Sequence, residues 1–231
     1  MFNSWHVISC FLFISIILKV CLADNDNLHD ICPAATPTSK TCDAATFING
    51  LPCKDPANIT ASDFKTSYLK HRGDTFNFLL SSTNIVTAAE FPGLNTLGLG
   101  LARTDLEVDG IVTPHSHPRA AEILFVSKGV VTVGFIDTSN QVFQKVLREG
   151  DVFIIPKSML HFCFNVGYEF ATIFSVLNSQ NPGLIDISGA VFGSSSEAAT
   201  KMKERVVSLS SLNKADATSS QTTFSHQHTE L

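Results

Sequence analysis

Charged residues, and basic ones above all, are scarce in this sequence. Charged residues make up 16% of the 231 residues against 44% hydrophobic ones, which excludes an intrinsically disordered chain. The 16 Lys and Arg residues are outnumbered by 21 Asp and Glu residues, giving a net charge of −5. Nucleic-acid binding normally needs a basic face, so no nucleic-acid partner is expected. The length suits one domain of ordinary size.

Cysteines and long apolar runs are also few. Six cysteines are too few for a fold held by disulfides alone. The run Val7–Leu18 has 12 mostly apolar residues, whereas a membrane-spanning helix needs about 20. With small residues at Cys21 and Ala23, it predicts a secretory signal peptide over residues 1–23. The alternative is an uncleaved anchor, since no Lys or Arg precedes the run and Lys19 lies near its end.

Removal of the signal peptide changes the composition of the mature chain. Taking 23 residues, one of them a Lys, from 231 leaves 208 residues with a net charge of −6. We expect a secreted protein without membrane attachment, in an oxidising compartment where disulfides persist. The sequon Asn58-Ile59-Thr60 makes Asn58 a candidate glycosylation site. The cysteines that remain are Cys32, Cys42, Cys53 and Cys163.

Composition divides the mature chain into four segments. Residues 24–60, with three cysteines, indicate an irregular arm stapled by a disulfide. Residues 61–193 alternate short β-branched and aromatic runs with turn residues, which predicts an all-β sandwich or barrel. Residues 194–212 predict a C-terminal helix, and residues 213–231 a polar, disordered tail. The predicted strands are Ile85–Phe91, Thr96–Leu106, Glu122–Ser127, Val130–Ile136, Val142–Leu147, Asp151–Ile155, His161–Val166 and Phe170–Leu177.

Two histidines and a carboxylate form the most informative stretch. His115 and His117 are two residues apart, so on a strand both side chains project from one face. Two imidazoles on one face can bind one metal ion. Pro118 interrupts the strand, and Glu122 opens the next apolar run, from which its carboxylate could return to the same site.

A second stretch supplies a third imidazole. Residues 150–165 predict a strand, a turn with Pro156 and a second strand that carries His161. An unpaired buried polar group is costly, so a histidine in an apolar strand indicates a bound partner. Each histidine alone could instead be a hydrogen-bonded strand residue. The same spacing in His226-Gln227-His228 has neither strand nor carboxylate beside it.

Three imidazoles and one carboxylate form a donor set of nitrogen and oxygen. It suits Mn²⁺, Fe²⁺, Zn²⁺ or Cu²⁺ and lacks the thiolates of a closed structural zinc site. Neutral imidazoles and one carboxylate leave a divalent ion a net charge of about +1, which favours a small anionic substrate or ligand.

The two stretches resemble the two motifs of the cupin superfamily, G(x)nHxH(x)4E(x)6G and G(x)5P(x)4HxxxN. The second fits in every spacing from Gly150 to Asn165, and the first fits from His115 to Gly129. Over residues 24–195 the chain is similar to the plant germin-like proteins. The shared stretches are Cys-Lys-Asp-Pro (53–56), His-Arg-Gly-Asp (71–74), Phe-Pro-Gly-Leu-Asn-Thr-Leu-Gly (91–98), His-Pro-Arg-Ala (117–120), Gln-Asn-Pro-Gly (180–183) and Ala-Val-Phe-Gly (190–193).

The resemblance implies a cupin jelly-roll β-barrel, to which the pattern of residues 194–212 adds a short C-terminal helical segment. It implies a disulfide between Cys32 and Cys53, a location in the apoplast or cell wall, and a homo-oligomer, either a trimer or a hexamer. Activities in the family include oxalate oxidase, superoxide dismutase and nucleotide-sugar hydrolysis, while other members bind auxin or have no known activity. The metal implied is manganese, and its implied ligands are His115, His117, Glu122 and His161.

Two departures from the family pattern bear on the activity. Oxalate-oxidising germins carry asparagines where this chain has Ala102 and Val112. Such amides orient oxalate and apolar side chains cannot, so weak or absent oxalate oxidase activity is expected.

The favoured function is superoxide dismutation in wall, stress or defence oxidation, with Asn165 or a water orienting or protonating the peroxide. The alternative is a non-enzymatic binding or structural protein of the apoplast, whose metal stabilises the barrel and whose open face holds an anion such as an auxin. A small, mostly apolar pocket would favour it.

Cys163 has two interpretations. It alternates with Phe162 and Phe164 beside a predicted ligand. It is either a small buried hydrophobe or a thiol that oxidises or pairs with Cys42.

Overall fold

The computed structural model describes residues 30–35, 50–193 and 196–209. The predicted signal peptide, Cys42 and the predicted tail lie outside these ranges. Among the described residues, no helix is long and apolar enough to cross a membrane. The chain forms two compact units, divided between Cys32 and Pro33, and the fold described below belongs to the second.

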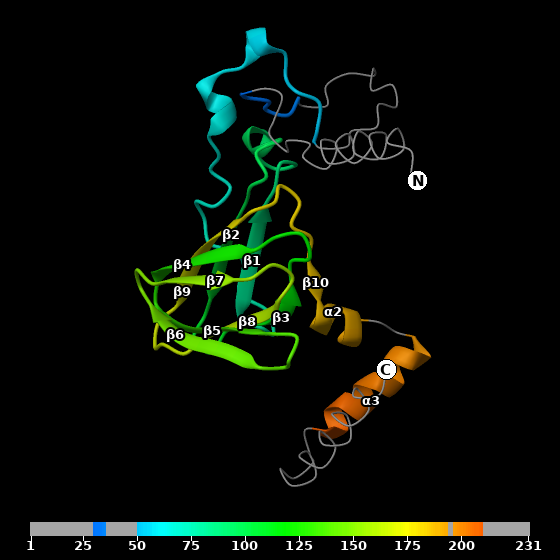
Figure 1. Cartoon of the computed structure of the whole chain (residues 1–231). Helices are drawn as coiled ribbons and strands as arrows, with labels where there is room; N and C mark the ends of the chain where they lie inside the picture. Colours follow the sequence, from blue (N-terminus) through cyan, green and yellow to red (C-terminus); the bar gives the residue numbers. More distant parts are fainter. Residues whose placement is uncertain (1–29, 36–49, 194–195, 210–231) are drawn as a thin grey trace, which may run out of the picture. The chain divides into compact units, whose positions relative to one another are not determined.

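Two five-stranded antiparallel sheets form the body of the second unit (Figure 1). One sheet has the order β1-β2-β9-β4-β7 and the other the order β10-β3-β8-β5-β6. From β2 onward the chain crosses repeatedly between the sheets, which is the connectivity of a jelly-roll barrel. The strands are β1 (Ser81–Val86), β2 (Gly100–Leu106), β3 (Ile111–Ser116), β4 (Glu122–Lys128), β5 (Val130–Ile136), β6 (Val142–Arg148), β7 (Val152–Ile155), β8 (Leu160–Asn165), β9 (Ala171–Leu177) and β10 (Ile185–Asp186). The predicted all-β cupin barrel is confirmed.

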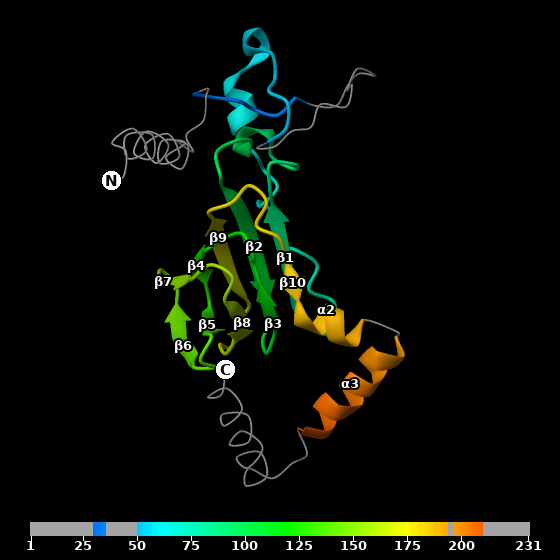
Figure 2. The same cartoon turned by 45° about the vertical axis from the view of Figure 1, so that its right-hand side comes forward.

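The C-terminal helical segment follows β10 directly (Figure 2). Helix α2 spans Ile187–Phe192, and Asp186 caps it by accepting hydrogen bonds from the backbone N–H groups of Ser188 and Gly189. Helix α3 spans Glu197–Leu209. Helix α3 lies within the helical segment predicted over residues 194–212, whereas helix α2 precedes that segment and was not predicted.

The core lies between the sheets and follows the period of two along each strand. In β4, Glu122, Leu124 and Val126 are buried, whereas Ile123 and Phe125 are exposed. This alternation directs the Glu122 carboxylate into the barrel beside apolar neighbours. The buried core cluster is Leu106, Leu124, Val126, Val131, Val133, Leu147, Ile155, Cys163, Ala171 and Ile173.

Six of the eight predicted strands agree with the structure within one residue at each end, and the first two differ. Strand β1 ends at Val86 because Thr87 begins a turn, in which its N–H and Oγ1 both donate to Glu90 Oε2. A 3₁₀ turn, η3 (Pro92–Leu94), follows. Strand β10 was not predicted, since two residues are too short to form a pattern.

The segment before the barrel is irregular. Cys32 and Cys53 are both disulfide-bonded, while their pairing with each other stays a prediction. Asn58 is exposed in the 3₁₀ turn η1 (Pro56–Asn58), and a second turn, η2 (Ala61–Phe64), follows it. The candidate glycosylation site is therefore accessible.

Candidate metal centre

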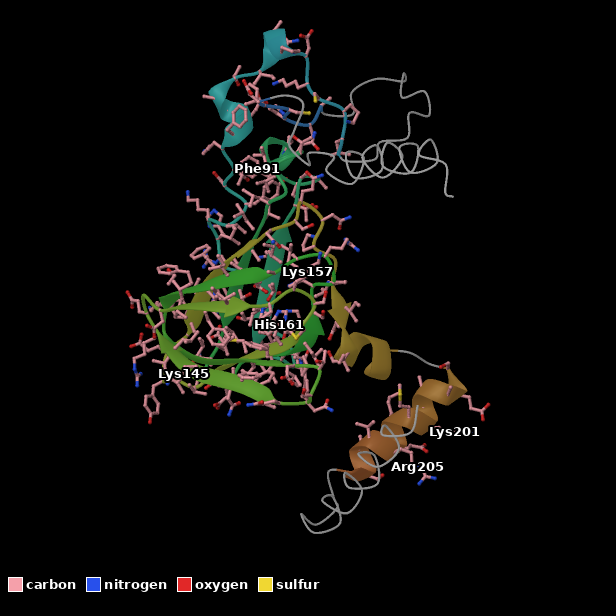
Figure 3. All side chains as sticks on the ribbon, in the orientation of Figure 1. Phe91, Lys145, Lys157, His161, Lys201 and Arg205 are labelled. Atoms are coloured by element: carbon pink, nitrogen blue, oxygen red, sulfur yellow. The ribbon has the colours of Figure 1, made fainter. Side chains whose placement is uncertain are left out.

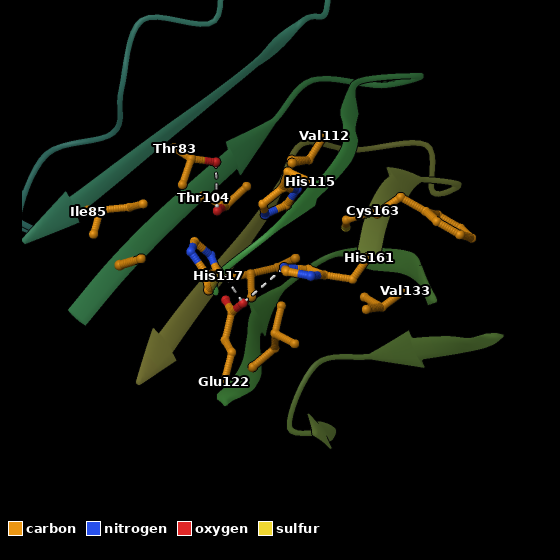
Figure 4. Close-up of a pocket in the computed structure, with 14 residues that line it drawn as sticks. Thr83, Ile85, Thr104, Val112, His115, His117, Glu122, Val133, His161 and Cys163 are labelled. Carbon is orange, nitrogen blue, oxygen red and sulfur yellow. Dashed lines mark hydrogen bonds and ion pairs between the residues drawn. The ribbon is translucent and has the colours of Figure 1, made fainter. Parts of the chain in front are cut away.

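The structure brings the four predicted ligands together inside the barrel (Figure 4). His115 of β3 lies opposite His161 of β8, and Glu122 opens β4 in the other sheet. His117 lies just past β3, which ends at Ser116, so the expectation that both histidines stand on one strand holds only for His115. Figure 3 places His161 inside the barrel and Lys145 on the outer strand β6.

The distances within this set are those of donors around one ion. Ligand nitrogen atoms of the three histidines all lie within 4.8 Å of one another. Glu122 Oε2 is 3.1 Å from His161 Nε2 and 3.6 Å from His117 Nε2. Donors that share a first-row metal ion at about 2.0–2.2 Å lie about 3–4 Å apart. The cluster could therefore hold a metal ion.

Backbone carbonyl groups fix the orientation of all three imidazoles. Each Nδ1 lies at hydrogen-bond distance from a carbonyl oxygen, which can only accept, so Nδ1 carries the proton. Each Nε2 is left with a free lone pair. The carbonyl acceptors are Thr113 O for His115 (2.9 Å), Gly183 O for His117 (2.7 Å) and Met159 O for His161 (2.9 Å).

Two atoms of the cluster, which face each other at 3.1 Å, are buried and lack a hydrogen bond. Within the described part of the chain, His161 Nε2 and Glu122 Oε2 are buried and make no hydrogen bond. Unsatisfied buried polar atoms are costly, and a metal ion would satisfy both at once. A mixed set of imidazole nitrogen and carboxylate oxygen suits a divalent first-row metal, so the residues present fit such an ion.

Protonation also favours a metal. Burial, together with the nearby His161, lowers the pKa of His115 to about 4, so this imidazole is neutral at neutral pH. Burial opposes ionisation of Glu122, but its contacts with His161, Ser175 and His117 hold the pKa of this carboxyl below its ordinary value. A neutral imidazole and an ionised carboxylate are the forms that bind metals.

A cavity of about 30 Å³ lies against the cluster. Pockets for drug-sized ligands measure about 300–1,000 Å³, so this small cavity suits a ligand of a few heavy atoms. Ala102 and Val112, the two departures noted in the sequence, both line the cavity, and neither side chain offers it a hydrogen-bond donor. The other apolar lining residues are Ile85, Leu124, Val133, Phe162, Cys163 and Ile173, and the polar ones outside the cluster are Thr83 and Thr104.

Cys163 is a buried free thiol. Burial raises its pKa to about 12, so it stays protonated and is not a thiolate ligand. The structure supports the interpretation as a small buried hydrophobe and not the pairing with Cys42.

Arg119 holds the loop that orients His117, a role that the sequence did not reveal. Its Nε donates to Asn181 O (2.7 Å) and its Nη2 to Asn181 Oδ1 (2.8 Å). The loop then offers Gly183 O to His117. Gly183 has φ +71°, a left-handed conformation that favours glycine, and a Cβ there would crowd the Arg119 guanidinium at 2.8 Å. The shared stretches at 117–120 and 180–183 were the available signal.

Asn165 does not line the cavity. It is 2% exposed, and its Nδ2 donates to the carbonyl oxygens of Leu106, Glu107 and Glu169. Its Oδ1 accepts from Gly167 N–H. With its amide occupied by the backbone, Asn165 ties loops together, and this geometry does not support its expected catalytic role.

Comparison with known proteins agrees with this geometry. Residues 67–210 match the family described as Cupin. Germin-like protein subfamily 3 member 4 of Arabidopsis thaliana is 54% identical over 187 residues, 81% of this chain and 84% of the relative. Germin-like protein 11-1 of Oryza sativa subsp. japonica is 48% identical over 214 residues, 92% and 95% of the two chains. A solved structure of oxalate oxidase is 36% identical, with a TM-score of 0.67 over 74% of this chain and 84% of that one. The chain therefore belongs to the cupins and, among them, to the germin-like proteins.

Proposed function

We propose that the chain is a secreted germin-like protein that binds manganese and dismutates superoxide. The observation that carries the proposal is a pair of buried atoms without a hydrogen bond, His161 Nε2 and Glu122 Oε2, among the four proposed ligands and beside a cavity of about 30 Å³. The choice of manganese among divalent metals rests on the family resemblance. The proposed ligands are His115, His117, Glu122 and His161.

The chain's own residues suit this chemistry. A bound manganese ion would supply the one-electron oxidation and reduction that dismutation requires. Three neutral imidazoles and one carboxylate leave a divalent ion a net charge of about +1, which attracts an anion. The small cavity has room for a diatomic anion, and most of its lining side chains are apolar.

Oxalate oxidation is not proposed, although oxalate oxidases are among the solved relatives. Ala102 and Val112 line the cavity, and neither side chain can donate a hydrogen bond to a dianion. We expect no hydrogen peroxide release from oxalate by the metal-loaded protein. Release at the rate of an oxalate oxidase measured in parallel would contradict this.

A second candidate is a non-enzymatic protein of the apoplast that binds an anion, for which the mostly apolar cavity lining speaks. The volume of about 30 Å³ argues against an auxin in this cavity, since pockets for drug-sized ligands measure about 300–1,000 Å³. If this candidate holds, its ligand is an anion of a few heavy atoms.

We propose cleavage after Ala23, glycosylation at Asn58, a Cys32–Cys53 disulfide, a location in the apoplast or wall, and a homo-oligomer, trimer or hexamer. The disulfide-bonded cysteines and the exposed sequon support export. The secreted protein should begin at Asp24 and lose mass on glycosidase treatment, and light scattering should give the oligomer.

The test of function couples metal analysis to a superoxide assay on wild type and His115→Ala. Under the enzyme proposal, the variant loses metal and dismutation but stays folded. Under the binding or structural candidate, wild type shows no turnover and the metal-free variant unfolds.

A further inference from the structure

Two threonines face the cavity from neighbouring strands. In the antiparallel pair of β1 and β2, Thr83 lies opposite Thr104 and Ile85 lies opposite Ala102. All four line the cavity, as the period of two along each strand requires. Arg103, between Ala102 and Thr104, points to the other face and pairs with Asp105.

The two hydroxyl groups form a hydrogen-bonded pair. Thr83 Oγ1 and Thr104 Oγ1 are 3.0 Å apart, and either atom could be the donor (Figure 4). A hydroxyl has one hydrogen and two acceptor lone pairs. When one threonine donates to the other, the second keeps its hydrogen for a group in the cavity.

The cavity offers a bound anion few other donors. Among the described side chains that line it, Thr83 and Thr104 are the polar ones outside the four proposed ligands, and Cys163 adds only a thiol. A thiol is a weak donor, and the rest of the wall is apolar. The two threonines lie at different depths: Thr83 is exposed to solvent, whereas Thr104 is buried, with 8% of its surface exposed.

We propose that the Thr83–Thr104 hydroxyl pair is the hydrogen-bond site that orients a small anion bound beside the histidine cluster. The ligand class is an oxyanion or dioxygen-derived anion of two or three heavy atoms, as the cavity volume of about 30 Å³ requires. Thr83 and Thr104 are positioning residues: one hydroxyl donates to the other, and the second donates its hydrogen to the anion. The inference rests on the proposed function, because it requires that the manganese-loaded site binds an anion.

The test is azide binding to the manganese-loaded full chain, measured by titration calorimetry. Thr104→Val removes one hydroxyl at nearly constant volume and should weaken azide binding about tenfold, the effect of a hydrogen bond to a charged group. Thr83→Val should weaken it similarly, and the double variant should be little worse than either, because the hydroxyls act as a pair. Thr104→Ser keeps the hydroxyl and should bind within about threefold of wild type. Thr132→Val, on β5 and outside the cavity lining, is the matched control and should bind as wild type does.

Azide binding and manganese content of the threonine variants distinguish the inference from the proposed function. Azide binding that is unchanged in Thr104→Val and Thr83→Val, with manganese content retained, overturns the inference and leaves the proposed function standing. Loss of manganese from these variants shows a structural role and also overturns it. A manganese-loaded wild type that binds no azide contradicts the open site of the proposed function and the inference with it.

Discussion

Strand β2 separates two buried polar clusters that differ in how their atoms are satisfied. On its outer face lies the Asp105 cluster, made of Gly73, Arg103, Asp105 and Thr172. The Asp105 carboxylate is 0% exposed and accepts from Arg103 Nε, Arg103 Nη2, Gly73 N–H and Thr172 Oγ1. Arg103 also donates to the carbonyl oxygens of Leu69 and Lys70, which ties this segment to the sheet.

The histidine cluster on the other side of β2 is organised differently. All three Nδ1 atoms are bonded to the backbone, yet within the described residues His161 Nε2 and Glu122 Oε2 have no hydrogen-bond partner. A buried charge whose hydrogen bonds are all made by protein groups stabilises the fold. Buried side chains that the backbone orients, but whose other polar atoms lack hydrogen bonds, are arranged to bind a ligand. The contrast assigns structure to the Asp105 cluster and chemistry to the histidine cluster.

Removal of one histidine should give the largest effect. His161→Ala deletes a proposed ligand, so manganese content and superoxide dismutation should both fall at least about a hundredfold, more than loss of an outer-shell partner. The Asp105 cluster is untouched, so circular dichroism should remain that of a folded barrel. Retention of manganese by the folded variant would contradict the assignment.

Removing a side chain from the Asp105 cluster should lower the free energy of unfolding and leave metal binding unchanged. Asp105→Ala leaves the Arg103 guanidinium without its buried partner, and the free energy of unfolding in urea should fall by about 3–5 kcal/mol. Thr172→Val is a milder comparison and should cost about 1 kcal/mol. If the folded Asp105→Ala protein lost its metal while keeping its stability, the division between the clusters would fail.

The loop held by Arg119 offers an intermediate test. Arg119→Ala frees the segment that presents Gly183 O to His117, so manganese affinity should fall about 10- to 100-fold in a competition with a chelator. The manganese affinity of Arg119→Lys should lie between those of Arg119→Ala and wild type, because lysine cannot reproduce the planar, two-pronged guanidinium of arginine. An unchanged affinity in Arg119→Ala would remove the loop from the account of His117.

Acid should separate the clusters in the metal-free protein. The pKa of His115 is lowered from 6.5 to about 4, so the unfolded chain binds the extra proton first. The contribution of neutral His115 to the free energy of unfolding is present above about pH 6.5 and is lost as the pH falls toward 4. Burial opposes ionisation of Asp105, but Arg103, Gly73 and Thr172 hold its pKa below 3.8. Its contribution is present above that value and is lost only in stronger acid.

Urea unfolding at a series of pH values measures this difference. In His115→Gln, the free energy of unfolding should depend less on pH between 6.5 and 4 and should keep its pH dependence below 4. In Asp105→Asn, the pH dependence below 4 should weaken and that between 6.5 and 4 should remain. The same change in both variants would show that the two clusters are not separable.

The sequence predicted the elements that depend on local pattern. Alternating apolar residues located six strands, and the spacing of His115, His117, Glu122 and His161 indicated one metal site. The roles of Arg119 and of the Thr83–Thr104 pair, and the structural role of Asn165, were not predicted because partners of these residues lie far along the chain. Arg119 contacts Asn181, 62 residues away, and Asn165 binds Glu107, 58 residues away. Asn165 fits the motif spacing in the sequence, and only the contacts of its amide show that it binds backbone.

The most direct test of the central claim is elemental analysis of the full-length secreted protein, purified without chelator or added metal. The account predicts about one manganese ion per chain in wild type and almost none in folded Glu122→Gln, since Glu122 Oε2 is one of the two buried atoms without a hydrogen bond. A folded, metal-free wild type, or a Glu122→Gln variant with full manganese content, would contradict it.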